Sequence, residues 1–498
     1  MLSRASQGRV LASVARATPQ APRTAARRSD AGSEAASVSP SYTKASFSTS
    51  RSSHLFPLTH LSHSPVFLDK VASPDSSGVI PAFRLLDGQG HVLPEVPEEW
   101  KKQLEEVPEE TWVKLYKSMM FLPALDTILA SSQRQGRISF YSQLGAMVIQ
   151  VNIKPLSRTY VVLAVTSYGE EGAVVGSAAA WSPTDEVFAQ YREVGVLVWR
   201  DYPLSDLMAQ VFSTVSDKAS KGRQMPVHYG SPTHHFHTIS SPLGTQIPQA
   251  AGAAYSLKLS PERKGDCVIC YMGEGATSEG DFHAGFNMAS VLGGPVVFFV
   301  RNNGFAISTP AAQQYKGDGI AARGPGYGIE TVRVDGNDPL AVYLASKEAR
   351  RRAVEGQNPV LVEAMSYRVG HHSTSDDSSA YRSTDDVSSI KKLDSPLFRL
   401  RSYLETRNLW SSELEEATKV EQRKSILRAY AGADKEKKPA WEEMFGGVYG
   451  DREDGGLERH LKEQKMEVKR LIGKWGQSDM WKKDLERHDG GIEAVKKW

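Results

Sequence analysis

The chain has 498 residues, of which 40% are hydrophobic, 24% charged and 9% aromatic. This composition lies near the globular average and excludes a mostly disordered or a collagen-like chain. Sixty lysines and arginines nearly balance 58 aspartates and glutamates, so the net charge does not indicate a nucleic-acid partner. Two cysteines exclude a disulfide scaffold. No apolar run approaches the roughly 18 residues of a membrane span, so none is expected.

The first 62 residues differ in composition from the rest of the chain. Residues 1–29 contain six arginines and no acidic residue, and the first 65 residues contain 15 serines. An arginine-rich, serine-rich and acid-poor segment is typical of a mitochondrial transit peptide. We therefore expect residues 1–62 to be a leader that directs the protein to the mitochondrial matrix. A disordered basic tail is the alternative interpretation.

Helical patterns flank the central part of the sequence. Residues 63–140 are interpreted as an N-terminal extension, in which residues 95–132 carry apolar side chains at helical intervals. Residues 393–498 are charged and predict a C-terminal helical region. It contains five widely spaced tryptophans: Trp410, Trp441, Trp475, Trp481 and Trp498. This region is more polar than a second core would be, so we expect a helical appendage or a subunit contact.

Between the two helical regions, helix and strand patterns alternate. The expected helices cover 247–259, 282–292 and 339–354, and the expected strands cover 267–272, 295–300 and 359–367. Asp338 and Pro339 supply an N-cap and a first-turn proline for the third helix. The alternation predicts an α/β fold, with a doubly wound, mostly parallel sheet over residues 168–392. In such folds the ligand binds at the carboxyl ends of the strands.

Each expected strand ends in polar residues. The three sequences are Gly273-Glu274-Gly275, Arg301-Asn302-Asn303-Gly304-Phe305 and Arg368-Val369-Gly370-His371-His372-Ser373. A carboxylate and an asparagine oxygen suit Mg²⁺, which takes further ligands from a diphosphate and water. The 26 residues between Gly275 and Asn302 match one strand-helix-strand unit, so the first two strand ends are expected to be neighbours.

This spacing resembles the thiamine diphosphate fingerprint, in which Gly-Asp-Gly is followed at a similar interval by Asn-Asn. The present chain differs in having Glu274 in place of the aspartate. A literal Gly317-Asp318-Gly319 also occurs, but no Asn-Asn follows it at the required interval. We interpret that second sequence as a loop. The resemblance implies the thiamine diphosphate-binding version of the predicted fold.

A wider resemblance covers about residues 83–404. Its most specific stretches are residues 240–249 and 371–383, which are similar to the alpha subunits of branched-chain 2-oxo acid dehydrogenases. The resemblance implies oxidative decarboxylation of branched-chain 2-oxo acids and reductive acylation of lipoamide on a transacylase core. Pyruvate dehydrogenase alpha subunits are the nearest alternative. They have one histidine before the serine equivalent to Ser373 and lack the Ser-Ser-Pro-Leu sequence.

The resemblance also implies individual residue roles. Mg²⁺ would be held by Glu274, the Asn303 side chain and the Phe305 carbonyl, and the diphosphate by Tyr191, Arg192 and Arg301. The Ser241 backbone, Leu243, Gly275 and Ala276 would complete the thiamine site, and Ser240, Pro242, Thr245 and Gln246 would form a K⁺ site. A helix N-terminus capped by serine is the alternative for this last sequence. His372 would contact the cofactor and transfer protons in catalysis.

The same resemblance implies partners and regulation. A catalytic glutamate of the family belongs to the beta subunit, so an alpha2beta2 heterotetramer is expected and this chain alone should be inactive. A lipoyl-bearing transacylase core would accept the acyl group. Ser373 and Ser383 match phosphorylated positions, which implies a regulatory kinase and phosphatase. Phosphate beside His372 would repel nearby carboxylates and disorder the loop.

Two features depart from the resemblance. Residues 141–167 form an atypical insertion. It has two possible explanations, a retained intron in the gene model and a true insertion in this lineage. Cys267 and Cys270 form a CxxC sequence, but side chains at this spacing in a strand face opposite sides, so we interpret both as buried small residues.

Two other classes of protein are alternatives to this assignment. A nicotinamide dehydrogenase is disfavoured because the sequence around Glu274 lacks the third glycine of its fingerprint. A non-catalytic scaffold is suggested only by the charged C-terminal helices. Binding of thiamine diphosphate separates the three hypotheses.

Overall fold

The computed structural model describes residues 61–68, 79–135, 138, 169–369, 378, 381, 394–447, 449 and 458–498. All of them belong to one compact unit, Ser53–Trp498. The predicted leader lies outside the described residues except for Leu61 and Ser62, which form a short strand of the sheet. The insertion at 141–167 also lies outside them, as do His371, His372, Ser373 and Ser383. The proposed domain boundaries therefore stay predictions.

In the described part of the chain, seven strands form one sheet in the order β1-β2-β8-β9-β5-β4-β3. Their bounds are β1 Leu61–Ser62, β2 Ala82–Phe83, β3 Glu186–Phe188, β4 Val268–Gly273, β5 Val296–Asn302, β8 Glu330–Asp335 and β9 Val360–Met365. Every neighbouring pair is parallel, which confirms the predicted sheet. A separate antiparallel ribbon joins β6 (Phe305–Ala306) to β7 (Thr309–Pro310).

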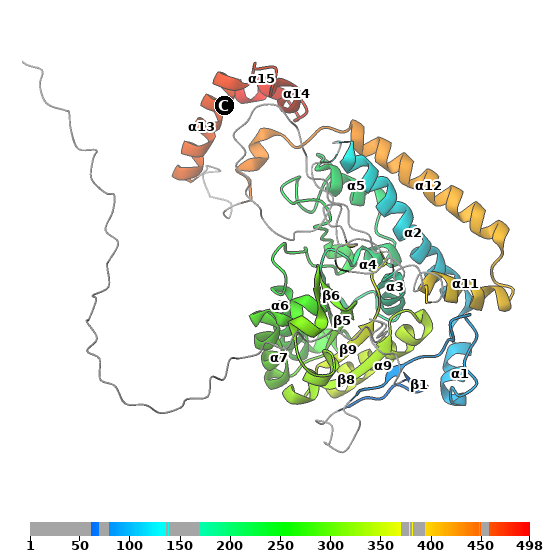
Figure 1. The fold of residues 1–498 in the computed structure, drawn as a ribbon. Helices are drawn as coiled ribbons and strands as arrows, with labels where there is room; N and C mark the ends of the chain where they lie inside the picture. The colour runs from blue at the N-terminus through cyan, green and yellow to red at the C-terminus, as the bar shows by residue number, and fades with distance from the viewer. Residues whose placement is uncertain are drawn as a thin grey trace, which may run out of the picture. The chain divides into compact units, whose positions relative to one another are not determined.

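Helices cover both faces of the sheet, as a doubly wound fold requires. In Figure 1, α6 (Gln246–Leu259) and α7 (Gly280–Leu292) lie on one side and α9 (Pro339–Gly356) on the other. The α9 helix packs on α3 (Glu171–Ala178). Gly176 permits this approach, because a Cβ there would lie 3.0 Å from the Pro339 carbonyl oxygen.

The strands alternate between two hydrophobic cores. On β4, Ile269 and Tyr271 enter the core under α3 and α9, whereas Val268 and Met272 enter the core under α6 and α7. The two cysteines follow the same period: Cys267 lies in the first core and Cys270 in the second, both buried and free. The interpretation of the CxxC sequence as buried small side chains is confirmed.

The N-terminal helices and the first C-terminal helices pack together. These elements are α1 (Glu98–Glu105), α2 (Glu109–Arg134), α4 (Val194–Trp199), α5 (Leu204–Phe212), α11 (Pro396–Thr406) and α12 (Ser412–Lys435). Trp410 is 5% exposed and meets the Tyr116 ring edge-on at 5.0 Å. Leu400 and Ile426 enter the same core as β4, so α11 and α12 are parts of the main packing unit.

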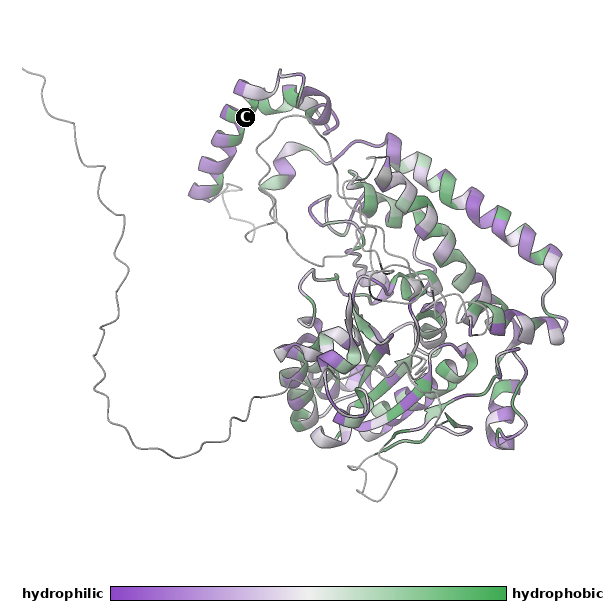
Figure 2. Cartoon of the chain, viewed as in Figure 1, coloured by the Kyte–Doolittle hydropathy of each residue, from purple (hydrophilic) through white to green (hydrophobic). Residues whose placement is uncertain are grey.

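The remaining helices are shorter or more polar. They are α8 (Ala311–Gln314), α13 (Arg459–Trp475), α14 (Lys482–Leu485) and α15 (Gly491–Lys496). Figure 2 shows the strands of the sheet as mainly hydrophobic and α13 as mainly hydrophilic. A small core of Ile472, Ile492 and Val495 joins α13 to α15. Among the described residues, no helix combines the length and apolarity that a membrane crossing requires.

The segment between β5 and β9 contains one loop that the sequence predicted and one strand that it did not. The Gly317-Asp318-Gly319 sequence is a loop, as predicted, and Asp318 pairs with Arg333 at 2.8 Å. The β8 strand that carries Arg333 was not predicted. Because β8 is buried on both faces, its alternating polar residues are paired inside the protein and do not face solvent.

Asp338 connects α9 to the N-terminal segment. Its carboxylate accepts hydrogen bonds from the Leu340 and Ala341 N–H groups at 3.2 and 3.0 Å, which confirms the predicted N-cap. It also accepts from Leu85 and Leu86 at 2.7 and 2.6 Å. Four buried donors therefore depend on one side chain.

Replacing Asp338 by alanine should lower the free energy of unfolding by about 3 kcal/mol or more, because buried donors would lose their acceptor. Ser411→Ala is the matched control, since Ser411 caps α12 through Leu414 alone. It should cost about 1 kcal/mol or less. Urea denaturation measures both values. Equal losses for the two variants would contradict the role assigned to Asp338.

Candidate cofactor site

A cavity of about 210 Å³ lies where β4 and β5 end. Gly273 of β4 pairs with Arg301 of β5 in parallel register, so Glu274 and Asn303 follow at the same edge of the sheet. The lining residues are Gln190, Tyr191, Arg192, Leu243, Gly273, Glu274, Gly275, Ala276, Glu279, Arg301, Asn303, Phe305, Ala306, Ile307 and Arg368. The predicted proximity of the first two strand ends is confirmed.

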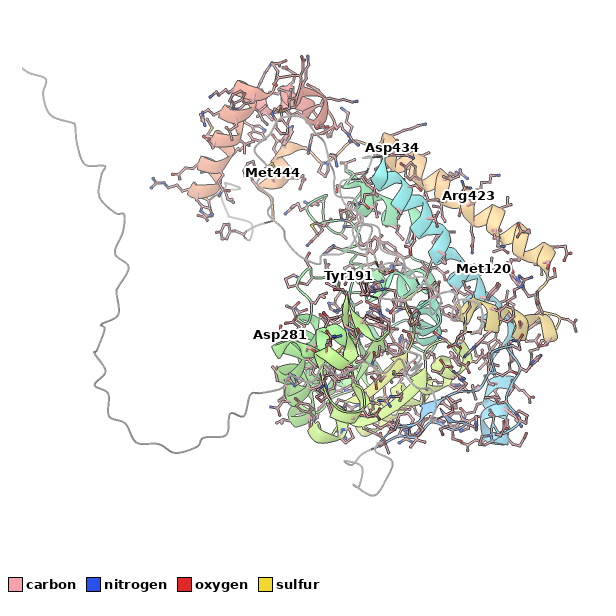
Figure 3. All side chains as sticks on the ribbon, viewed as in Figure 1. Met120, Tyr191, Asp281, Arg423, Asp434 and Met444 are labelled. Atoms are coloured by element: carbon pink, nitrogen blue, oxygen red, sulfur yellow. The ribbon has the colours of Figure 1, made fainter. Side chains whose placement is uncertain are left out.

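The cavity brings together most of the residues expected from the sequence. Nine of them line it: Tyr191, Arg192, Leu243, Glu274, Gly275, Ala276, Arg301, Asn303 and Phe305. Ser240, Ser241, Pro242, Thr245 and Gln246 are not among the lining residues. Figure 3 labels Tyr191 among the crowded side chains near the centre of the view, in agreement with its 8% exposure.

Glu274 is a buried carboxylate, only 2% exposed. Its Oε1 atom has no hydrogen-bond partner among the described residues. Burial, together with the nearby negative charge of Glu170, raises the pKa of Glu274 to about 7. A buried carboxylate oxygen without a donor is costly unless a cation balances it. This atom therefore fits a metal ligand.

The two asparagines that follow β5 have different roles. Asn302 donates to Glu363 at 2.7 Å and accepts from the Gly304 N–H at 3.0 Å, which holds the turn. Asn303 donates to Glu170 at 3.0 Å, and its Oδ1 accepts from the Phe305 N–H at 3.1 Å. An amide oxygen has two acceptor positions. The Asn303 oxygen can therefore also serve as a ligand in the cavity.

No described group of three or more His, Cys, Asp or Glu side chains could hold a metal. A divalent ion in this cavity could take a carboxylate ligand from Glu274. Hard oxygen ligands from Asn303 and the Phe305 carbonyl suit Mg²⁺, which takes further ligands from phosphate and water.

Three arginines line the cavity: Arg192, Arg301 and Arg368. Arg301 donates to Glu193 at 2.5 Å and to Glu170 at 2.9 Å, and Arg192 lies 3.5 Å from Glu170. Burial alone would raise the pKa of Glu170, but the charges of Arg301 and Arg192 outweigh it and lower that pKa. The guanidinium groups are therefore fixed in place by partners, which suits recognition of phosphate oxygens.

Sequence reasoning assigned no role to several residues of this site, among them Glu170, Glu193, Gln190 and Arg368. Gln190 accepts from the Gly273 N–H at 2.9 Å, and Arg368 donates to the Ile307 carbonyl at 2.9 Å. Glu193 directly follows the predicted Arg192, and Arg368 comes directly after the third predicted strand. Glu170 was harder to predict, because the only sequence feature that marks it is a pair of glutamates between two glycines, Gly169 to Gly172.

The sequence expected to bind K⁺ forms the turn before α6. Gly244 has φ +89°, a conformation that favours glycine. The Thr245 hydroxyl donates to the Pro242 carbonyl at 3.2 Å, and Gln246 donates to the Tyr271 carbonyl at 3.1 Å. Thr245 is the N-cap of α6 without a side-chain cap bond, so no serine caps this helix. The K⁺ assignment stays a prediction.

The fold and the cavity define an α/β protein with a buried, charged cavity at the carboxyl edge of a parallel sheet. Residues 143–442 match the model of the family described as dehydrogenase E1 component. The chain belongs to this family, which implies thiamine diphosphate as the cofactor.

Named relatives agree with this assignment. The chain is 51% identical over 403 residues to the mitochondrial 2-oxoisovalerate dehydrogenase subunit alpha of Homo sapiens, covering 79% of this chain and 83% of the relative. It is 45% identical to the same-named protein of Caenorhabditis elegans, covering 80% and 86%. It is 44% identical to 2-oxoisovalerate dehydrogenase subunit alpha 1, mitochondrial, of Arabidopsis thaliana, covering 81% and 78%.

The raised pKa of Glu274 predicts a pH-dependent stability of the metal-free protein. A carboxyl with a pKa of about 7 when folded and near 4.5 when unfolded binds its proton more tightly in the folded state. Folding therefore loses stability as the pH rises from about 4.5 to 7, by roughly 3 kcal/mol in all.

Glu274→Gln removes this titration. With a chelator present, the unfolding free energy of the variant minus that of the unmodified chain should therefore be larger at pH 8 than at pH 5. Glu279→Gln, at an exposed position of the same cavity, is the control. Denaturant titrations at the two pH values measure the difference. The same stability difference at both would show that Glu274 is not protonated in the folded chain.

Proposed function

We propose that the chain is the alpha subunit of a branched-chain 2-oxo acid dehydrogenase. It would catalyse oxidative decarboxylation of the 2-oxo acids derived from valine, leucine and isoleucine, and reductive acylation of lipoamide. The observation that carries this proposal is the 51% identity to a 2-oxoisovalerate dehydrogenase subunit alpha along 79% of the chain. The names of the relatives favour this substrate over pyruvate, the alternative considered from the sequence.

The cavity supports the cofactor assignment by its charges. Tyr191, Arg192 and Arg301 would bind the diphosphate of thiamine diphosphate, with Leu243, Gly275, Ala276 and the Ser241 backbone around the rest of it. Glu274, Asn303 and the Phe305 carbonyl would hold Mg²⁺. Ser240, Pro242, Thr245 and Gln246 would hold K⁺. The unpartnered Glu274 oxygen is the strongest support for the metal.

The cofactor supplies the electron sink for decarboxylation, and the chain supplies placement and charge. The fixed arginines orient the diphosphate and balance its charge. Tyr191, Leu243 and Ala276 line the cavity and would exclude water from the bound cofactor. His372 would transfer protons, by its resemblance to the family's catalytic histidine.

The partners and the location follow from the same relationship. The chain would join a beta subunit in an alpha2beta2 heterotetramer and pass the acyl group to a lipoyl-bearing transacylase core. The relatives are named mitochondrial, and residues 1–62 have a transit-peptide composition. We therefore place the protein in the mitochondrial matrix.

Co-expression with a beta subunit tests the proposal. The complex should decarboxylate 2-oxoisovalerate with at least about tenfold higher kcat/KM than pyruvate, because a pocket for a branched chain gains apolar contacts. Activity should require thiamine diphosphate and Mg²⁺, and the chain without the beta subunit should be inactive. Preference for pyruvate would assign the chain to the alternative class, and binding of NADH without thiamine diphosphate would overturn the proposal.

Regulation by phosphorylation is part of the proposal. Ser373→Glu adds a negative charge beside His372, so we expect loss of overall activity in the reconstituted complex. Ser373→Ala should retain activity and resist a branched-chain dehydrogenase kinase. Full overall activity of Ser373→Glu would refute this regulatory role.

A further inference from the structure

Residues 228–241 form a hairpin of two extended segments that leads into the cavity wall. Ser231 and Phe236 form an antiparallel bridge at its closed end. Nearer the open end, the Ile239 N–H donates to the Tyr229 carbonyl at 3.0 Å. Leu243, which lines the cavity, follows two residues after the hairpin ends. The hairpin therefore sets where the chain enters the cofactor site.

A histidine and a serine close the open end of this hairpin. The Nε2 atom of His228 lies 2.6 Å from the Ser241 hydroxyl, and its Nδ1 lies 3.0 Å from the Pro226 carbonyl. A carbonyl only accepts, so Nδ1 carries a hydrogen, and in the neutral ring Nε2 accepts from the serine. His228 is 1% exposed, whereas Ser241 is half-buried. The geometry fixes the histidine tautomer.

The imidazole is itself held by a tight turn. The His228 N–H donates to the Met225 carbonyl at 3.3 Å, and Gln210 of α5 donates to the same carbonyl at 2.7 Å. Pro226 and Val227 occupy the central positions, and Val227 has φ +65°. A type II turn normally has glycine or asparagine there, because a β-branched side chain is strained in this conformation.

The strained valine is kept in place by packing. Val227 is 5% exposed and belongs to the core under α3 and α9. Such strain persists only where the surroundings hold it, and it concentrates at functional sites. The turn therefore aims His228 at Ser241 at a cost in local backbone energy.

We propose that His228 is a positioning residue for cofactor binding. By holding the Ser241 hydroxyl, it fixes the backbone of residues 241–243 against the thiamine part of the cofactor. His228 does not line the cavity, so it acts through Ser241. This inference rests on the proposed function, in which the Ser241 backbone and Leu243 bind thiamine diphosphate.

The test uses the complex co-expressed with a beta subunit and titrates thiamine diphosphate by calorimetry at saturating Mg²⁺. His228→Ala and Ser241→Ala should each weaken binding about tenfold, the effect of one lost hydrogen bond. The double variant should bind no more weakly than either single variant, because both remove the same bond. For His228→Ala, whose side chain lies outside the cavity, kcat at saturating cofactor should stay within about twofold, as expected for a lost positioning contact.

Two conservative variants make the test specific. The Oε1 atom of glutamine can take the place of Nε2, so His228→Gln should recover most of the affinity. Asparagine is too short to reach Ser241 and replaces only the bond to Pro226, so His228→Asn should resemble His228→Ala.

The hairpin also offers a matched control at its closed end. Nδ1 of His234 lies 2.7 Å from the Ser231 hydroxyl, the same kind of pair far along the hairpin from Leu243. His234→Ala should leave cofactor affinity unchanged.

Three results would overturn the inference: wild-type affinity in Ser241→Ala, multiplicative losses in the double variant, or an equal loss in His234→Ala. If His228→Ala reduces the yield of folded complex, Ser241→Ala and His228→Gln decide the matter. If the unmodified complex does not bind thiamine diphosphate, the proposed function fails too. If it binds and the variants bind equally well, only the role of His228 fails.

Discussion

The pairing of Arg301 with Glu170 and Glu193 is the interaction on which the site depends. All three side chains are at most 2% exposed, so none of these charges could stay buried without the others. Arg301 lies near the carboxyl end of β5 in the central sheet, whereas Glu170 and Glu193 directly precede α3 and α4. The ion pairs therefore fix the helical layer to the carboxyl edge of the sheet. Asn303 and Arg192 join the same network through Glu170, which places the phosphate-binding and metal-binding groups relative to each other.

The parallel sheet explains why this network can exist. Parallel strands bring their carboxyl ends to one edge, and two buried hydrophobic cores hold β4 and β5 in register over six pairs of residues. The polar residues begin where the strands end. There, the turn at Gly304 and the short ribbon of β6 and β7 follow β5 directly, so Phe305 and Glu274 line the same cavity without a long loop.

Two residues in or near the site destabilise the folded chain. Glu274 has an unpartnered buried oxygen and a raised pKa, and Val227 has a strained backbone. Both features oppose folding, and both lie in or next to the segments that form the cavity. Natural proteins commonly keep such local costs where a ligand or a fixed geometry is needed. In this chain, the cost at Glu274 is electrostatic and the cost at Val227 is conformational.

The sequence by itself determined the α/β class, most of the central elements and the meeting of Glu274 with the asparagines at one edge of the sheet, because period-two and helical patterns, glycines and a fixed spacing are local signals. The other predicted residues of the cavity came from the resemblance to a known family. The sequence also predicted the Asp338 cap and the opposite facing of Cys267 and Cys270. Only the tertiary structure decided which charges compensate one another. Glu170 lies 131 residues from Arg301, and His228 lies 13 residues from Ser241. The two members of each pair come together only when the chain has folded, and no local sequence pattern shows which residues will meet.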